Sequence, residues 1–339
     1  MTNLTTNSTN VPDETTTAAI VLRKTRGSRG SRGSRPSRRD IARAERSVRI
    51  KDNSTDRVFM VAVYILLTTF LLVVLLPIIN IVASSLSSPA AVSSGRVLFW
   101  PVDFSLRGYE VALSDPQILT GFANSVFYTV AGTFVSVVLT IAIAYPLSRK
   151  NLWGRGFITS GIIFTMLFAG GLIPAYLVVQ SLGMLDTRWA MILPQAVGVW
   201  QVIIAMVFFR SSIPEELFEA AELDGAGDLK VLWRIVLPLS RPLIAVIALM
   251  YAITQWNSYF DALLYLRSSE LYPLQLVLRN ILILNNSGGG DIANQMERQQ
   301  LADLLKYSLI VVSTVPMMIV YPFVAKFFTK GIMIGAVKG

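Results

Sequence analysis

The side chains that most often carry out chemistry in proteins are missing from this sequence. Its 339 residues include no cysteine and no histidine, which removes thiolate nucleophiles, Cys-ligated metals and the commonest general base. The polar residues that stand out lie inside an apolar run: Thr254, Asn257, Ser258 and Asp261 recur there at helical spacing and are predicted to share one face. We therefore expect no catalytic residue and no metal ligand, and a solute-binding role for this polar face.

Polar groups inside an apolar helix are costly and often functional, so these residues are candidates for a solute path. Asp261 at the centre of a bilayer would cost roughly 2.5–3.5 kcal/mol, and we expect it to face a cavity or a partner. Trp256 and Tyr259 add aromatic surface beside it. Further candidates in other apolar runs are Asn124, Tyr128 and Gln201. The alternative is that all these side chains join neighbouring helices through hydrogen bonds.

The elements that would position these residues are long apolar runs. Hydrophobic residues make up 53% of the chain and charged residues 15%, well below the ~25% charge of a typical soluble domain. A helix needs ~20 apolar residues to cross a bilayer, and lipid offers the backbone no hydrogen-bond partner. Residues 53–339 are therefore predicted to form an all-α membrane domain with six transmembrane helices, at about 58–83, 122–147, 157–180, 189–209, 242–266 and 307–325.

The basic residues predict the orientation of these helices. Residues 21–51 hold twelve Lys or Arg against two acids, and the loop at 148–156 holds three basic residues and no acid. Lys and Arg in short flanks favour the cytoplasmic side, so both termini are predicted to be cytoplasmic in a multi-pass protein of the cell membrane. Residues 1–52 read as a disordered basic cytoplasmic tail held near anionic lipid.

The loop at 210–241 is predicted to lie on the same side, although it carries six acids against four basic residues. Ser212 can cap a helix there, and Pro214 suits its first turn. Gly225 can end that helix in a left-handed conformation.

A second short helix is predicted to follow in the same loop. Asp228 is its expected cap, and the helix at 229–237 should stop before Pro238. The loop would then be a helix, a sharp turn and a second helix along the membrane surface. The small residues of the first helix would allow another protein to approach closely.

The residues of this loop resemble a known pattern. Glu219-Ala220-Ala221, Asp224-Gly225-Ala226, Leu237-Pro238-Leu239 and Pro242 are similar to the EAA motif of binding-protein-dependent ABC importer permeases. The resemblance implies the type I ABC importer permease fold, in which this loop forms a cytoplasmic coupling helix seated in a cleft of the ATPase. The residues it assigns to ATPase coupling are Glu219, Ala220, Ala221, Asp224, Gly225 and Ala226. The alternative is a generic interfacial helix between two spans.

Other segments narrow the resemblance to carbohydrate permeases of the maltose type. The matching segments are 124–125, 144–149, 171–174, 185–187, 256–260 and 272–274. The resemblance covers residues 57–339 and is greatest for the polysaccharide or lipoprotein permease subgroup, whose members handle oligosaccharides. It implies that Trp256 and Tyr259 could stack on a sugar ring and that the loop at 285–300 reaches into a solute-binding protein.

The sequence contains no Gly-x-x-x-x-Gly-Lys-Ser/Thr phosphate loop, so ATP and Mg²⁺ are expected on a partner ATPase and no cofactor on this chain. The expected partners are ATP-binding subunits, a second homologous permease, an extracytoplasmic solute-binding protein, membrane lipid and a carbohydrate substrate, with no nucleic acid. One alternative is an ABC importer of a different solute. Two others are an ion-driven secondary transporter and an intramembrane enzyme. Copurification of an ATPase with this chain would favour the ATP-driven importer over both.

Overall fold

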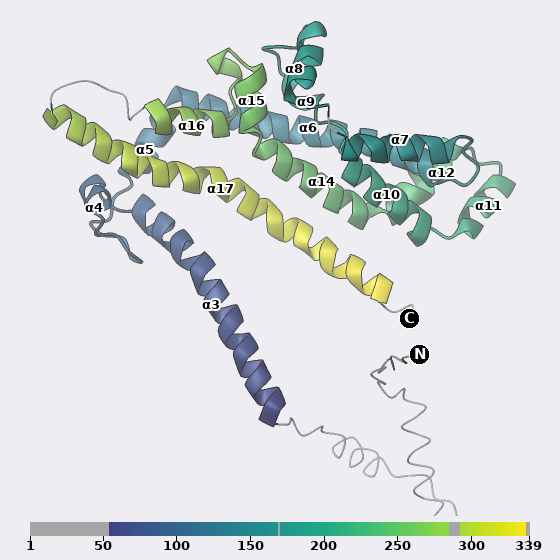
Figure 1. Ribbon diagram of the computed structural model, residues 1–339, viewed down its shortest axis with the longest axis horizontal. Helices are drawn as coiled ribbons and strands as arrows, with labels where there is room; N and C mark the ends of the chain where they lie inside the picture. The colour runs from purple at the N-terminus through teal and green to yellow at the C-terminus, as the bar shows by residue number, and fades with distance from the viewer. Residues whose placement is uncertain (1–53, 169, 285–291, 337–339) are drawn as a thin grey trace, which may run out of the picture. The chain divides into compact units, whose positions relative to one another are not determined.

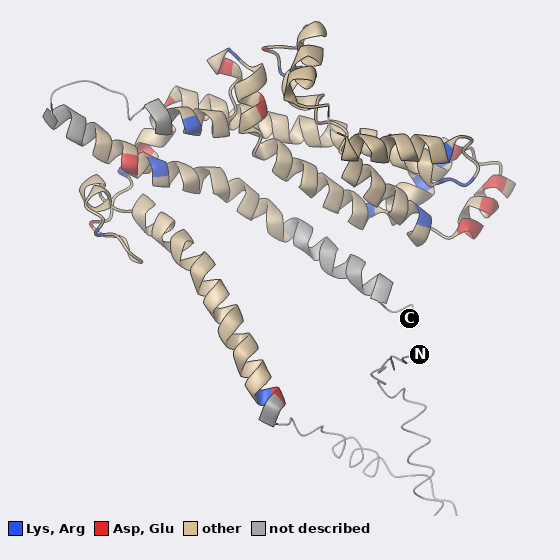
Figure 2. Ribbon diagram, viewed as in Figure 1, with Lys and Arg blue, Asp and Glu red and all other residues tan. Residues whose placement is uncertain are grey.

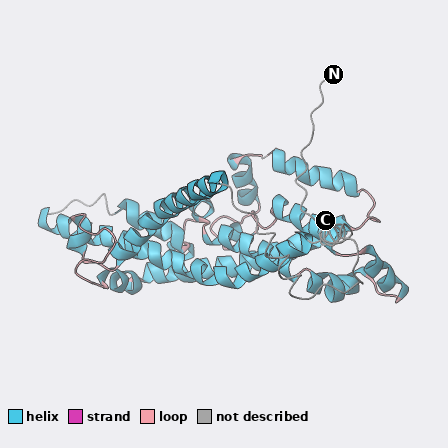
Figure 3. Cartoon of the chain, turned by 90° about the horizontal axis from the view of Figure 1, so that it is seen from below, coloured by secondary structure: helices cyan, strands magenta, loops and turns pink. Residues whose placement is uncertain are grey.

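The computed structural model describes residues 54–168, 170–284 and 292–336. The basic tail at 1–52 and the glycine-containing part of the loop at 285–291 lie outside the described residues. Every regular element of the described residues is a helix (Figures 1 and 3). The chain divides into two compact units between Thr69 and Phe70, and the sites below all lie in the second unit. The expectation of an all-α chain is thus confirmed for the part that is described.

Three helices are long and apolar enough to cross a membrane. They are α3 (Ser54–Ser85), α6 (Pro116–Ser148) and α17 (Ile292–Ala336). The most apolar stretch of α3 is exposed over its whole length, as expected of a surface that meets lipid or another apolar protein. Two bent helix pairs bring the number of candidate spans among the described residues to five. These helices make the chain an integral membrane protein.

Helix α6 runs through the centre of the second unit and begins at a well-defined cap. The Asp115 side chain accepts a hydrogen bond from the Gln117 N–H at 2.8 Å, and Pro116 occupies the first helical position. The helix packs against α10 (Val199–Ser212), α14 (Arg241–Trp256) and α16 (Leu274–Leu284).

One glycine allows the close approach of α6 and α14. A Cβ placed on Gly132 would lie 2.7 Å from the Cδ atom of Gln255, whose side chain is buried. Any side chain at this position would therefore overlap the neighbouring helix. Glycine at such contacts is typical of helix packing in membranes, where close backbone approach strengthens van der Waals contact.

Three of the predicted spans are broken rather than continuous, which corrects the expectation of unbroken helices. The run at 157–180 divides into α7 (Arg155–Leu167) and α8 (Leu172–Ser181), whose axes differ by 115°. Gly171 precedes α8 with φ at 88°, a conformation that glycine adopts at little steric cost. The consecutive glycines at this point thus end one helix and redirect the chain.

The run at 189–209 divides into α9 (Trp189–Ile192) and α10. Pro194 lies in the gap, and because it has no N–H it cannot continue the hydrogen bonds of α9. The first free N–H of α10, on Gly198, donates to the Tyr251 hydroxyl of α14 at 2.9 Å. Tyr251 also shares a 2.7 Å hydrogen bond with Thr140 of α6. The break therefore joins three helices through one tyrosine.

The run at 242–266 divides into α14 and α15 (Tyr259–Tyr265) at Asn257 and Ser258. The Asn257 amide donates to the Ile253 carbonyl at 2.8 Å, and the Ser258 hydroxyl donates to the Gln255 carbonyl at 2.6 Å. Both side chains thus add a second hydrogen bond to carbonyls in the last turn of α14, which also accept backbone N–H bonds. The four polar residues predicted to share one helical face are consequently divided between two helices.

Shorter helices fill the connections. They are α4 (Pro89–Ser93), α5 (Arg107–Ser114), α11 (Glu215–Leu223), α12 (Asp228–Val231), α13 (Leu237–Leu239), the π-helical turn Leu232–Val236 and the 3₁₀ turn Ser269–Leu271. Helices α4 and α5 pack on α17.

Asp186 joins two loops through hydrogen bonds. It belongs to the segment 185–187, one of those that resemble carbohydrate permeases. Its carboxylate accepts hydrogen bonds from the Ser268 hydroxyl at 2.6 Å and from the Ser268 and Arg267 N–H groups at 2.9 Å. These bonds hold the pKa of Asp186 below its usual value, and the bond from the Ser268 hydroxyl has the largest effect. The loop at 181–188 is thereby fixed to the chain that follows α15.

Candidate coupling segment and solute cavity

The predicted turn of the 210–241 loop is present at Gly225. Helix α11 ends there with φ of Gly225 at 69°, and the Ala226 N–H donates to the Ala221 carbonyl at 2.9 Å. This left-handed end is the one expected of a helix that stops at glycine. The expected N-cap is wrong: Ser212 is the last residue of α10, and extended backbone at Ile213 and Pro214 separates it from α11.

The second helix of the loop also differs from the prediction. Gly227, rather than Asp228, stands at its N-cap. The helix does not stop before Pro238 but continues to Leu239 through the π-helical turn Leu232–Val236. Proline in a helix clashes with the carbonyl four residues earlier. The π turn contains Arg234, whose carbonyl is the one that Pro238 would meet in a regular helix.

The two faces of α11 have different surroundings. Phe218 and Ala221 are buried, 8% and 7% exposed, in the same core as residues of α6, α10 and α14. The exposed face holds Glu219 and Ala220, and the turn after it exposes Asp224 and Gly225. Ala226 is half-buried against the core. Of the six residues assigned to ATPase coupling, the structure thus leaves Glu219, Ala220, Asp224 and Gly225 most open to a partner.

One exposed residue of this surface was missed from the sequence. Leu223, the last residue of α11, is 90% exposed, and the helix that it ends carries several acidic residues, drawn red in Figure 2. The exposure of Leu223 depends on how α11 is oriented on the core, which the local sequence pattern does not reveal.

Helix α11 is held from outside the loop by Arg149, at the end of α6. The Arg149 guanidinium forms an ion pair with Glu222 at 2.9 Å and lies 4.0 Å from the centre of the Phe218 ring. The Arg149 side chain is only 18% exposed, so solvent screens these contacts less than at an open surface. Lys150 forms a second, exposed ion pair with Glu215. The Tyr145 hydroxyl adds a 3.2 Å hydrogen bond to the Asp228 carbonyl.

We expect Arg149→Ala to loosen α11 while leaving the bundle folded. The loss of a half-buried cation–π contact and one ion pair should cost about 1–2 kcal/mol. Amide hydrogen exchange of residues 215–223 should accelerate, and coupling to ATP hydrolysis should weaken. Lys150→Ala is the matched control, because its exposed ion pair should contribute ~0–1 kcal/mol. Equal exchange rates in the two variants would show that Arg149 does not position α11.

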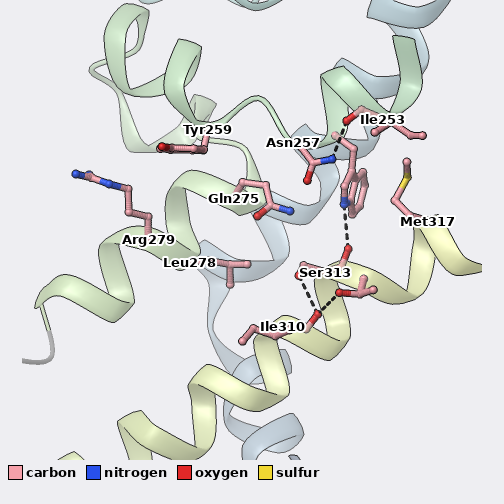
Figure 4. Close-up of a pocket in the computed structure, with 11 residues that line it drawn as sticks. Ile253, Asn257, Tyr259, Gln275, Leu278, Arg279, Ile310, Ser313 and Met317 are labelled. Atoms are coloured by element: carbon pink, nitrogen blue, oxygen red, sulfur yellow. Dashed lines mark hydrogen bonds between the residues drawn. The ribbon is translucent and has the colours of Figure 1, made fainter. Parts of the chain in front are cut away.

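A cavity of about 870 Å³ lies where α14, α15, α16 and α17 meet (Figure 4). Sites for small ligands usually enclose ~300–1,000 Å³. Helix α16 lines one side with Gln275 and Arg279, and α17 lines the other with Ser313 and Met317. The remaining lining residues are Ile253, Trp256, Asn257, Tyr259, Leu278, Ile310 and Thr314. The walls therefore combine apolar and aromatic surface with a few polar groups, as a solute site requires.

The structure brings two of the predicted solute-path residues, Trp256 and Asn257, to this cavity. Trp256 is 4% exposed, and its indole N–H donates to the Ser313 carbonyl at 2.9 Å. Its ring also meets Phe122 edge-on, with centroids 5.9 Å apart. Trp256 thus forms part of the cavity wall, whereas Tyr259, 44% exposed, offers a ring for stacking.

The other candidates lie elsewhere. The Asn124 amide donates to the Glu270 carbonyl at 2.7 Å, and the Tyr128 hydroxyl donates to the Leu271 carbonyl at 2.9 Å. These residues join α6 to the turn before α16, the helix-joining role weighed as the alternative. Asp261 also joins two segments, because its carboxylate accepts a hydrogen bond from the Gln195 amide at 2.6 Å. Ser258 bonds to the last turn of α14, and Thr254 donates to the Met250 carbonyl at 3.0 Å. Gln201 is half-buried beside Gly198.

The residues of α16 and α17 in the cavity were not identified from the sequence. Gln275 and Arg279 are four residues apart and therefore share one face of α16. The segment of α16 lies between the predicted spans at 242–266 and 307–325 and was not predicted to form a span. Only the packing of α16 against α6 and α17 makes these residues part of a cavity.

Bent helix pairs that are apolar enough to span a membrane, and a cavity lined by both apolar and polar side chains, are features of membrane transport subunits. No family model matches the chain, but individual proteins do. It is 42% identical over 291 residues to the protein LplC of Bacillus subtilis (strain 168), covering 85% of this chain and 97% of the relative. It is 43% identical over 285 residues to the polygalacturonan/rhamnogalacturonan transport system permease protein YtcP of the same organism, covering 84% and 99%.

A solved structure agrees with these relatives. A chain from a bacterial ABC transporter involved in the import of the acidic polysaccharide alginate superposes with a TM-score of 0.76 at 37% identity, covering 81% of this chain and 98% of that one. The chain therefore belongs to the permease subunits of carbohydrate ABC transporters.

Proposed function

We propose that this chain is one of two permease subunits that form the membrane path of an ATP-driven importer for an oligosaccharide. An extracytoplasmic solute-binding protein delivers the sugar, and separate ATPase subunits bind ATP and Mg²⁺. The cavity beside Asn257 and Tyr259 belongs to the sugar path. The observation that carries the proposal is the identity of more than 40% over nearly the full length of a polysaccharide transport permease.

The proposed topology has six spans: α3, α6, α7 with α8, α9 with α10, α14 with α15, and α17. Support comes from the apolar length of α3, α6 and α17 and from the bent pair of α7 with α8. The positions of Lys and Arg support cytoplasmic termini. Broken helices in transporters commonly line substrate paths, because irregular backbone is tolerated where it faces protein or a water-filled cavity.

Helix α11 is the proposed coupling helix. Its support is geometric: one face is anchored in the core through Phe218, and Arg149 fixes its position from outside. The opposite face exposes Glu219 and Leu223. A helix anchored in this way moves with α6, α10 and α14 as one body. ATP-driven closure of the two ATPase subunits would then act through α11 and shift the equilibrium between the two conformations of the membrane path.

Copurification with reconstituted transport tests this proposal. The tagged chain should bring down a second permease and an ATPase, and the complex in vesicles should take up an oligosaccharide when ATP and the loaded binding protein are present. Uptake driven by an ion gradient without ATP would contradict the proposal. So would a complex that lacks an ATPase.

A further inference from the structure

The cavity between α14 and α17 carries a positive charge that transport of a neutral sugar does not need. Arg279 of α16 is its charged lining residue, and none of the residues that line it is an acid. Among the described residues, no carboxylate forms an ion pair with the Arg279 guanidinium. A half-buried guanidinium beside apolar walls attracts an anion more strongly than one in open solvent.

The groups around Arg279 fit a sugar that carries a carboxylate. Gln275 lies one helical turn before Arg279 on α16. In Figure 4 the Gln275 side chain points toward Asn257, whereas the Arg279 side chain points to the side on which Tyr259 lies. Tyr259 presents a half-exposed ring on which a pyranose can stack. The amides of Gln275 and Asn257 can bond to hydroxyls. The guanidinium fork matches a planar carboxylate, with which it can form two parallel hydrogen bonds.

We propose that Arg279 makes this cavity a site for acidic oligosaccharides, with its guanidinium binding the carboxylate of a uronate ring. The proposal rests on the function proposed above and names its substrate class. Tyr259 stacks on the face of that ring, and Gln275 and Asn257 position the hydroxyls of a neighbouring ring of the oligosaccharide. Lysine at position 279 keeps the charge but loses the two-pronged geometry.

The test uses the whole importer in vesicles with its binding protein. Uptake of a trigalacturonate is compared with uptake of the same trisaccharide after its carboxyl groups are reduced to alcohols. Arg279→Gln should lower uptake of the charged sugar about ten- to one hundred-fold, the usual effect of losing a charged hydrogen bond. Uptake of the charged sugar by Arg279→Lys should fall between that of the wild type and that of Arg279→Gln. Arg267→Gln, which removes an equal charge outside the cavity lining, should leave uptake unchanged.

The outcomes separate the two proposals. Basal ATP hydrolysis of each variant reports that the complex is assembled. If Arg279→Gln lowers uptake of both sugars equally, or of neither, Arg279 does not bind the carboxylate. If the wild-type complex takes up only neutral oligosaccharides, the substrate class is wrong but the importer stands. If no carbohydrate stimulates ATP hydrolysis in the wild type, the importer itself is wrong and this inference falls with it.

Discussion

Replacing Gly225 with tryptophan is expected to abolish sugar-stimulated ATP hydrolysis while the protein still inserts into the membrane. Gly225 has φ at 69°, and nothing in the described chain lies within 4 Å of a Cβ added there. A large side chain thus meets open space within this chain and would clash only with a partner. If the Gly225 turn is seated against an ATPase, the tryptophan side chain should lower sugar-stimulated ATP hydrolysis about ten-fold or more.

Gly225→Ala is the matched control for this variant. Alanine suffers the same unfavourable left-handed backbone, which costs about 1–2 kcal/mol, but adds almost no volume. The difference in sugar-stimulated ATP hydrolysis between the tryptophan and alanine variants therefore reports how much space the ATPase leaves beside residue 225. If Gly225→Trp retained full stimulation, α11 would not be seated in the ATPase at this turn.

Replacing Gly132 with leucine is expected to destabilise the contact between α6 and α14. Even a Cβ would lie 2.7 Å from Gln255, whose side chain is 2% exposed and has little room to move. Overpacking of this kind typically costs about 1–3 kcal/mol. The melting temperature of the purified protein in detergent should fall by about 5 °C.

Gly161→Leu is the control for this second prediction. Gly161 also lies within a membrane helix, α7, but a Cβ added there has no neighbour within 4 Å in the described chain. Its melting temperature should change by no more than about 1 °C, as for exposed substitutions in general. An equal loss in the two variants would contradict this account, because leucine favours a helix more than glycine does and only Gly132 lies at the approach of α6 to α14.

The apolar runs and the turn at Gly225 were predictable because both depend on residues close together in the sequence. Length and apolarity predict membrane helices, and a glycine after acidic and small residues predicts a left-handed helix end. The family resemblance rested on the same local motif, and the relatives confirm it.

The features that were missed depend on residues far apart in the sequence. Arg149 meets Glu222 across 73 residues, and Asn124 meets the Glu270 carbonyl across 146. Asn124 therefore looked like a free polar group in a span, although the fold uses it to hold a turn. The break at Asn257 was also missed, because polar residues at helical spacing are compatible with a continuous helix until their carbonyl partners are known.

The central claim is that α11 is the place where an ATPase engages this permease. Because the chain has no natural cysteine, a single cysteine can carry a photoactivated cross-linker without background. With the label at Leu223→Cys, on the 90% exposed end of α11, cross-linking in the assembled complex should yield one product that contains the ATPase. The same label at Leu182→Cys, 66% exposed in the loop predicted on the opposite side, should yield no such product. An ATPase product from Leu182→Cys, or none from Leu223→Cys in an intact complex, would contradict the account.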